Sequence, residues 1–229
     1  MTRSDSSDVL VQALGADLTP VRRLAPPGQR VLLWLGIVVT IAIALATVSN
    51  LGAMVHRLTA APDVAIAAIG SMLTAVLAAV AAFELSLPDR KPAWALLPLP
   101  AAALWICASG IGCLRPLVDA DTHPASLGES ESCLLFILGL SIPLSIVLII
   151  MLRRGCSLRP NLTAIVGGLA CAAAAATLLN FIHPYDATMS DLAVHGFAVG
   201  LVILANRIFG GRLLMGKNAE YAAAKRPPY

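Results

Sequence analysis

Six long runs of apolar residues, separated by short polar stretches, make up most of the chain. They cover residues 31–54, 64–87, 93–112, 134–152, 162–180 and 192–209. A helix needs about 20 apolar residues to cross the hydrocarbon core of a bilayer, so each run is long enough, or nearly so, to span a membrane. Prolines and charged residues fall between the runs, where helices are expected to end. The pattern predicts an all-α, polytopic integral membrane protein with six transmembrane helices.

The amino-acid composition supports a membrane protein. Hydrophobic residues make up 58% of the 229 positions and charged residues only 13%, whereas about 25% charged residues is usual in a soluble domain. The first thirty residues are polar and lack the apolar core of a secretory signal. We therefore expect the first apolar run to remain in the mature protein as a transmembrane helix.

Lysine and arginine are distributed unevenly among the connections between the runs. Of the 16 basic residues, 14 fall in the N-terminal segment, the second and fourth loops and the C-terminal segment, whereas Arg57 and Arg115 fall in the other loops. Cytoplasmic loops collect Lys and Arg, so both termini are expected in the cytoplasm. The basic residues thus indicate topology rather than a nucleic-acid-binding surface, and we expect no direct contact with nucleic acid.

The apolar runs contain little that suggests catalysis or transport. The sequence has no GxxxxGK[ST], HExxH, CxxC or GxSxG motif. Ionisable residues at membrane depth usually mark transport pathways, and Glu84, the one carboxylate inside a run, lies about a turn from its end. We therefore expect no enzyme, no catalytic residue and no cofactor. A small-solute transporter or channel is the alternative, and a membrane thiol oxidoreductase, which would need paired cysteines, is a third hypothesis.

The polar segment before the first run contains a predicted short amphipathic helix. Residues 6–18 (SSDVLVQALGADL) begin with serine and place Leu10, Leu14 and Leu18 at helical spacing. Such a helix is marginal alone in water, because isolated helices need about 12–15 residues. Its polar face has no Lys or Arg, which is unfavourable for binding anionic lipid. We therefore expect this helix to bind a protein partner.

Two of the five cysteines are expected at the outer face of the membrane. Cys113 and Cys133 flank an acidic loop, residues 115–132, and His183 lies in the next outward loop. A thiolate and an imidazole suit a soft or borderline metal ion such as zinc, cadmium or copper. Cys133 and His183 therefore form a candidate metal site for an outside signal, with Cys113 as a third sensing residue. A structural Cys113–Cys133 disulfide and plain packing roles stay open as alternatives.

Three stretches of the chain resemble one bacterial family. They are LVQALGADLTPVRRLAPPGQRVLLWLG (residues 10–36), SCLLFILGLSIPL (132–144) and LRRGCSLRPNLTAIVGGLA (152–170). They are similar to NrsF-type proteins, six-helix membrane anti-sigma factors named as negative regulators of sigma factor F. Members of that family typically carry a second outward cysteine in an HCP context after the fifth helix. This chain reads FIHPYD there, with His183 in place of that cysteine, so a disulfide between those two positions is excluded.

The resemblance implies a function and a domain organisation. Residues 1–30 would be a cytoplasmic arm that binds an extracytoplasmic-function sigma factor, residues 31–209 a six-helix domain in the lipid bilayer of the bacterial inner membrane, and residues 210–229 a cytoplasmic tail. A periplasmic stress or metal signal would release the sigma factor. In the arm, leucines would dock in a groove, arginines would pair with acidic surface and prolines would keep the chain extended. The expected contact residues are Leu10, Leu14, Leu18, Pro20, Arg22, Arg23, Leu24, Pro26 and Pro27.

Overall fold

The structure is a computed structural model that describes residues 3–16, 24–114, 127–182 and 189–215. All the regular elements in these ranges are helical, as predicted. They are α1 (Arg3–Ala16), α2 (Pro27–Val48), α3 (Leu51–Ala60), α4 (Pro62–Leu85), η1 (Pro92–Leu96), α5 (Leu99–Leu114), α6 (Leu127–Leu152), α7 (Pro160–Leu179), α8 (Met189–Ala205) and η3 (Asn206–Gly210). Six helices are long and apolar enough to cross a membrane, which confirms the predicted number of spans.

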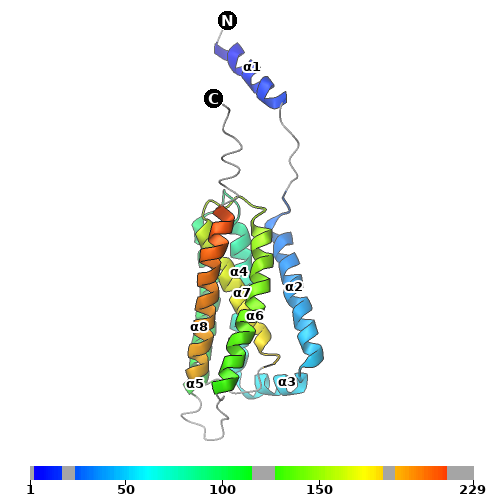
Figure 1. The fold of residues 1–229 in the computed structure, drawn as a ribbon, viewed down its shortest axis with the longest axis vertical. Helices are drawn as coiled ribbons and strands as arrows, with labels where there is room; N and C mark the ends of the chain where they lie inside the picture. Colours follow the sequence, from blue (N-terminus) through cyan, green and yellow to red (C-terminus); the bar gives the residue numbers. More distant parts are fainter. Residues whose placement is uncertain (1–2, 17–23, 115–126, 183–188, 216–229) are drawn as a thin grey trace.

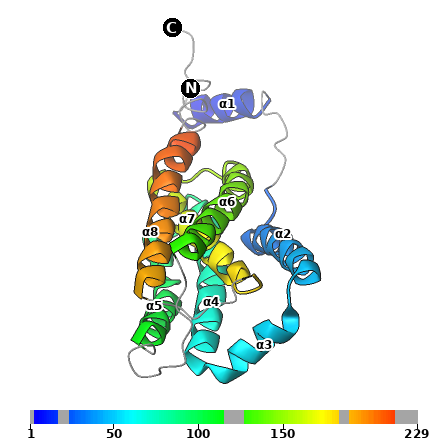
Figure 2. The same ribbon diagram turned by 60° about the horizontal axis from the view of Figure 1, so that its bottom comes forward.

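The six long helices form a bundle with α7 at its centre (Figures 1 and 2). α7 packs against α4, α6 and α8, and α5 packs against α4. α2 lies on the outside, where it contacts α4, α6 and α7. In each span we compare an apolar stretch of 18 residues. In α7, 72% of this stretch is buried inside the bundle, but in α2 only 11% is buried. The bundle therefore has a tightly enclosed central helix and a loosely attached first helix.

Small residues allow the central helices to approach closely. A Cβ atom added at Gly168 of α7 would lie 2.9 Å from the Asn206 Cβ and 3.1 Å from the Ile203 Cα. A Cβ atom added at Gly70 of α4 would lie 2.9 Å from the Trp105 Cα on α5. Helix association in lipid depends on this kind of close packing, because lipid tails are as apolar as the helices.

Hydrogen bonds between helices satisfy polar side chains inside the bundle. Asn206 donates to Ser145 Oγ over 2.9 Å, which joins the end of α8 to α6. Thr177 on α7 donates to Ser71 Oγ on α4 over 2.9 Å. A polar group in hydrocarbon needs such a partner, since no water is present to replace it.

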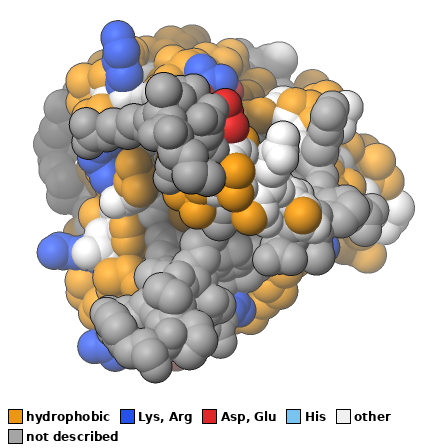
Figure 3. Space-filling view, turned by 90° about the horizontal axis from the view of Figure 1, so that it is seen from above, with side chains coloured by type: hydrophobic (Ala, Val, Ile, Leu, Met, Phe, Trp, Pro, Cys, Tyr) orange, Lys and Arg blue, Asp and Glu red, His pale blue; other side chains and the backbone are white. Residues whose placement is uncertain are grey.

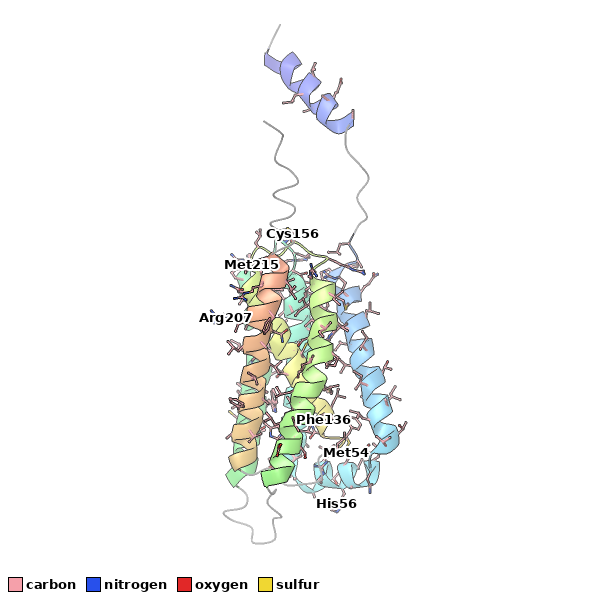
Figure 4. All side chains as sticks on the ribbon, viewed as in Figure 1. Met54, His56, Phe136, Cys156, Arg207 and Met215 are labelled. Carbon is pink, nitrogen blue, oxygen red and sulfur yellow. The ribbon has the colours of Figure 1, made fainter. Side chains whose placement is uncertain are left out.

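The first span ends earlier than the apolar pattern predicts. The run over residues 31–54 predicts one continuous helix, but α2 ends at Val48 and the separate α3 begins at Leu51. The Asn50 side chain accepts a hydrogen bond from the Ala53 amide and caps α3. α3 lies across the foot of the bundle in Figure 1, and Figure 4 places Met54 there. Hydropathy alone cannot separate these helices, because both are apolar.

The last helical segment is longer than predicted. The expected span ends at Phe209, but the helical chain continues through η3, a wide π-type turn, to Met215. Figure 4 shows Met215 at the end of the bundle from which the N-terminal segment extends. We call this end, where α2 and α7 begin and α4 and α6 end, the arm end.

Candidate functional site

The N-terminal segment contains a helix, although it begins and ends earlier than the predicted residues 6–18 and its apolar residues are not confined to one face. α1 spans Arg3–Ala16 and lies beyond the arm end, apart from the bundle (Figure 1). The apolar side chains of Val9, Leu10 and Val11 are 67%, 60% and 68% exposed. An isolated helix of this length is marginal in water, and these three described side chains are mostly exposed. α1 therefore offers unburied apolar surface that a partner protein could cover.

The other predicted contact residues of the arm fall into three groups. Leu18, Pro20, Arg22 and Arg23 lie outside the described residues, and nothing is described of the Leu14 side chain. Leu24 is exposed. Pro26 caps the N-terminus of α2 and Pro27 is its first residue, a position where proline's missing N–H costs nothing. These two prolines thus begin the first span as well as ending the arm.

Arg30 fastens the beginning of α2 to the arm end. Its side chain is only 5% exposed, although it is charged. One guanidinium nitrogen donates to Ser86 Oγ over 3.1 Å, and the other donates to the main-chain carbonyl of Met151. The guanidinium also lies over the Phe83 ring, 4.8 Å from its centroid. A buried charge requires such partners, and here they come from the ends of α4 and α6.

A second set of hydrogen bonds joins the same end of α4 to α7. Ser157, in the connection between α6 and α7, donates to the Leu85 carbonyl over 3.1 Å. Its hydroxyl is also 2.8 Å from that of Thr163, which bonds the same carbonyl. The basic connection between α6 and α7, part of the stretch that is similar to NrsF-type proteins, therefore packs against the end of α4. We call Arg30, Ser86, Ser157 and Thr163 the clasp; it connects the helix that carries the arm to the centre of the bundle.

Basic side chains are exposed on the arm end. Figure 3, which views this end, shows Lys and Arg side chains around its edge with hydrophobic side chains between them. Arg154 and Arg159 are exposed in the connection between α6 and α7. Glu84, the carboxylate noted inside an apolar run, is paired with Arg90 over 2.9 Å. Its neighbour in the structure is thus a surface arginine.

Of the predicted sensing residues, Cys133 is the one whose side chain is described, and it lies toward the opposite end of the bundle. Cys133, near the start of α6, is 5% exposed and packs among Ile137, Ala175, Leu179 and Ala198. Cys133 thus lies against α7 and α8 rather than on the surface, which corrects the expectation of an accessible thiol. His183 lies outside the described residues, and nothing is described of the Cys113 side chain. In the part of the chain that is described, no three His, Cys, Asp or Glu residues gather as a metal site.

Sequence reasoning missed the clasp. Arg30 reads as one of several basic residues that flank a first span, and flanking charge is explained by topology alone. One signal was available: Arg30 falls in the first turn of the helix that Pro26 and Pro27 begin, so its side chain is fixed to α2. Its burial depends on residues 56 and 121 positions away in the sequence, which no local pattern reveals.

Comparison with known proteins decides the family. The model of the family described as "Negative regulator of sigma F" (NrsF) matches residues 14–215. The chain belongs to the NrsF family. The matched range includes the last part of α1, the clasp and all six spans. The family's description implies negative regulation of a sigma factor, and so a sigma factor as partner. No curated protein and no solved structure matches the chain.

Proposed function

We propose that this NrsF protein is an inner-membrane anti-sigma factor that holds an extracytoplasmic-function sigma factor on its cytoplasmic arm. Regulation, rather than catalysis or solute transport, is its role. The observation that carries the proposal is α1, whose Val9, Leu10 and Val11 side chains are exposed, in a chain of a sigma-regulator family. An amphipathic helix in a groove is a common mode of peptide recognition.

The proposed orientation rests on charge. The arm end would face the cytoplasm, because 14 of the 16 Lys and Arg residues lie in the terminal segments and the even-numbered loops. A sigma factor is a cytoplasmic protein, so this orientation brings arm and partner together. Alkaline phosphatase fused after Arg226 should be inactive, and the same enzyme fused near Asp121 should be active. The reverse pattern would contradict the orientation.

The contact with the sigma factor would combine apolar and charged parts. Leu10, Leu14 and Leu18 would dock as a stripe, while Arg22 and Arg23 would pair with acidic surface, a contribution that salt weakens. Pro20 and the pair Pro26-Pro27 would keep the connection extended and set its reach from the bilayer. In this arrangement α2 and the clasp hold the arm at a fixed place on the membrane.

The experiment is a repression assay in cells with a reporter of the sigma factor. Replacing Leu10 and Leu14 together by Asp should abolish repression, because charges on the stripe cannot enter an apolar groove. Gln12→Asp with Ala16→Asp is the matched control, since it adds the same charge to the opposite side of α1 and should leave repression intact. Both proteins must be present in the membrane at the level of the parent. Full repression by the Leu10→Asp/Leu14→Asp protein would disprove the arm contact.

The signal is the second part of the proposal. Cys133 and His183, with Cys113 nearby in the predicted topology, would bind a soft or borderline metal ion outside the membrane. Binding would act only as far as the metal favours one arrangement of the bundle over another. Because Cys133 is buried against α7 and α8, the metal would have to separate these helices at that end. Such a movement would reach the arm end through α7, which carries Thr163 of the clasp, and through α6, whose Met151 carbonyl accepts from Arg30.

Variants of these two residues test the signal. Cys133→Ser and His183→Ala should each keep resting repression and lose induction by zinc, cadmium or copper. Cys107→Ser, which changes an exposed thiol on α5, is the control and should respond as the parent does. Parental induction by metal in both test variants would show that the sensor lies elsewhere.

A further inference from the structure

A groove between α6 and α8 is not explained by sigma-factor binding. It has a volume of about 410 Å³. Ile142, Ile146 and Ile150 of α6 and Phe209 of the last helical segment form its sides, and each is more than half exposed. These side chains lie on the outer surface of a membrane-spanning bundle, so the groove opens toward lipid.

The groove is long enough for an acyl chain. Its lining extends along α6 from Leu138 to Arg153, about 22 Å at 1.5 Å per residue. Half the hydrocarbon core of a bilayer is about 15 Å thick. The groove therefore runs from the arm end past the middle of the membrane. In its floor Asn206 and Ser145 bond each other, whereas the buried Ser141 hydroxyl has no hydrogen-bond partner among the described residues. Arg153 apart, the rest of the lining between α6 and α8 is apolar.

One end of the groove is positively charged. Arg153 lines it at the arm end, and its Nε atom is buried without a hydrogen-bond partner among the described residues. A buried donor left unpaired costs free energy, and a guanidinium is matched best by a phosphate or carboxylate. Arg207 and Arg212 are exposed on the last turns of the chain's final helical segment, and Figure 4 places Arg207 toward the same end. Neither of them lines the groove, so Arg153 is the basic side chain in its lining.

We propose that the groove binds one anionic glycerophospholipid, with its phosphate at Arg153 and one acyl chain between α6 and α8. Apart from the Ser141 hydroxyl, the Ser145–Asn206 pair and Arg153, the lining is apolar. The occupant must therefore be mainly apolar and anionic at one end, and basic pockets between transmembrane helices bind anionic headgroups. A second copy of the chain would cover the apolar walls, but it would leave the Arg153 Nε atom needing an anion. This proposal requires only that the bundle lies in a bilayer, and it does not depend on the sigma factor.

Native mass spectrometry of the detergent-purified full chain tests the proposal, with dioleoylphosphatidylglycerol as the probe. The parent should retain one lipid, and Arg153→Gln should weaken retention at least about tenfold, because a charged hydrogen bond is lost. Arg159→Gln is the control; Arg159 is exposed at the same end and does not line the groove. It should retain the lipid as the parent does.

A second pair of variants tests the apolar part without changing charge. Ala205→Phe fills the groove from α8 and should also lose the lipid. Ala44→Phe, on the exposed side of α2, adds the same ring elsewhere on the lipid-facing surface and should have no effect. If Arg153→Gln fails to fold, lipid retention by Ala205→Phe and thermal melting of the parent test whether the groove binds the lipid. Phosphatidylglycerol should raise the melting temperature more than phosphatidylethanolamine, and inorganic phosphate should not raise it.

Three results would overturn the proposal. Equal retention of phosphatidylglycerol by all variants would show unspecific lipid around the bundle. Oleate bound as tightly as phosphatidylglycerol would show that a carboxylate and one chain suffice, so the ligand would not be a glycerophospholipid. A dimer that Ala205→Phe dissociates would show that the groove is an interface between copies of the chain.

Discussion

The central helix α7 and the first helix α2 are equally convincing as membrane spans but differ in how they are held. α7 is enclosed by α4, α6 and α8, with 72% of its apolar stretch buried, whereas α2 has 11% buried and lies at the edge. The buried residues of α2 are Arg30, Val31 and Trp34, all in its first two turns. Trp34 donates to the Leu144 carbonyl over 3.4 Å. α2 is thus fastened at the arm end and little enclosed beyond it.

This difference assigns separate tasks to the two regions. α7 and its neighbours form a core whose close contacts leave few alternative arrangements. α2 carries the arm and touches this core through Arg30 of the clasp and through apolar side chains, chiefly the buried Val31 and Trp34. A change in the positions of α4, α6 or α7 at the arm end would therefore reach the arm through these residues.

Gly168→Leu should have the largest effect on the core. The new side chain would collide with Asn206 and Ile203, and overpacking of this kind costs about 3 kcal/mol or more when backbones must separate. Gly36→Leu on α2 is the matched control, because a Cβ there meets nothing within 4 Å. Thermal melting in detergent should show a large loss for the first variant and none for the second. Equal melting temperatures would mean that α7 and α8 do not pack as described.

Arg30→Gln should release the beginning of α2 while leaving the core folded. It removes a charged hydrogen bond worth about 1.5–3 kcal/mol and the contact with the Phe83 ring. Trp34, which is fully buried one turn later, should then be oxidised several-fold faster in hydroxyl-radical footprinting. Arg154→Gln removes an exposed arginine nearby and should leave the oxidation rate unchanged. An unchanged rate in Arg30→Gln would show that α2 is held by other contacts.

Ser157→Ala should have the smallest effect of the three. It removes one hydroxyl from the clasp, and Thr163 still bonds the Leu85 carbonyl over 3.3 Å, so about 1 kcal/mol should be lost. Thr40→Ala, whose hydroxyl is exposed and bonds the Gly36 carbonyl of its own helix, should cost much less. Both values come from the same melting assay. If Ser157→Ala lowers the stability no more than Thr40→Ala does, the Ser157 hydroxyl does not help to hold the clasp together.

The sequence predicts the number and approximate positions of the spans because the hydrocarbon core imposes one length on every one of them. It predicts α1 from local helical spacing. It does not predict the break at Asn50, since hydropathy stays high across it. The burial of Cys133 and the contacts of Arg30 were also missed, because both depend on how distant helices meet. Hydropathy and helical spacing thus predict the individual helices, whereas the contacts of the clasp can be seen only in the packed bundle.

The affinity of the isolated arm for the sigma factor tests the central claim most directly. A synthetic peptide of residues 1–26 and the full chain in lipid nanodiscs are each titrated with the extracytoplasmic-function sigma factor encoded nearest to this gene. If the arm makes the contact and the bundle only positions it, the two dissociation constants should agree within about tenfold, or 1.4 kcal/mol, and both should weaken with salt. Tight binding by the full chain with no detectable binding by the peptide would contradict the account.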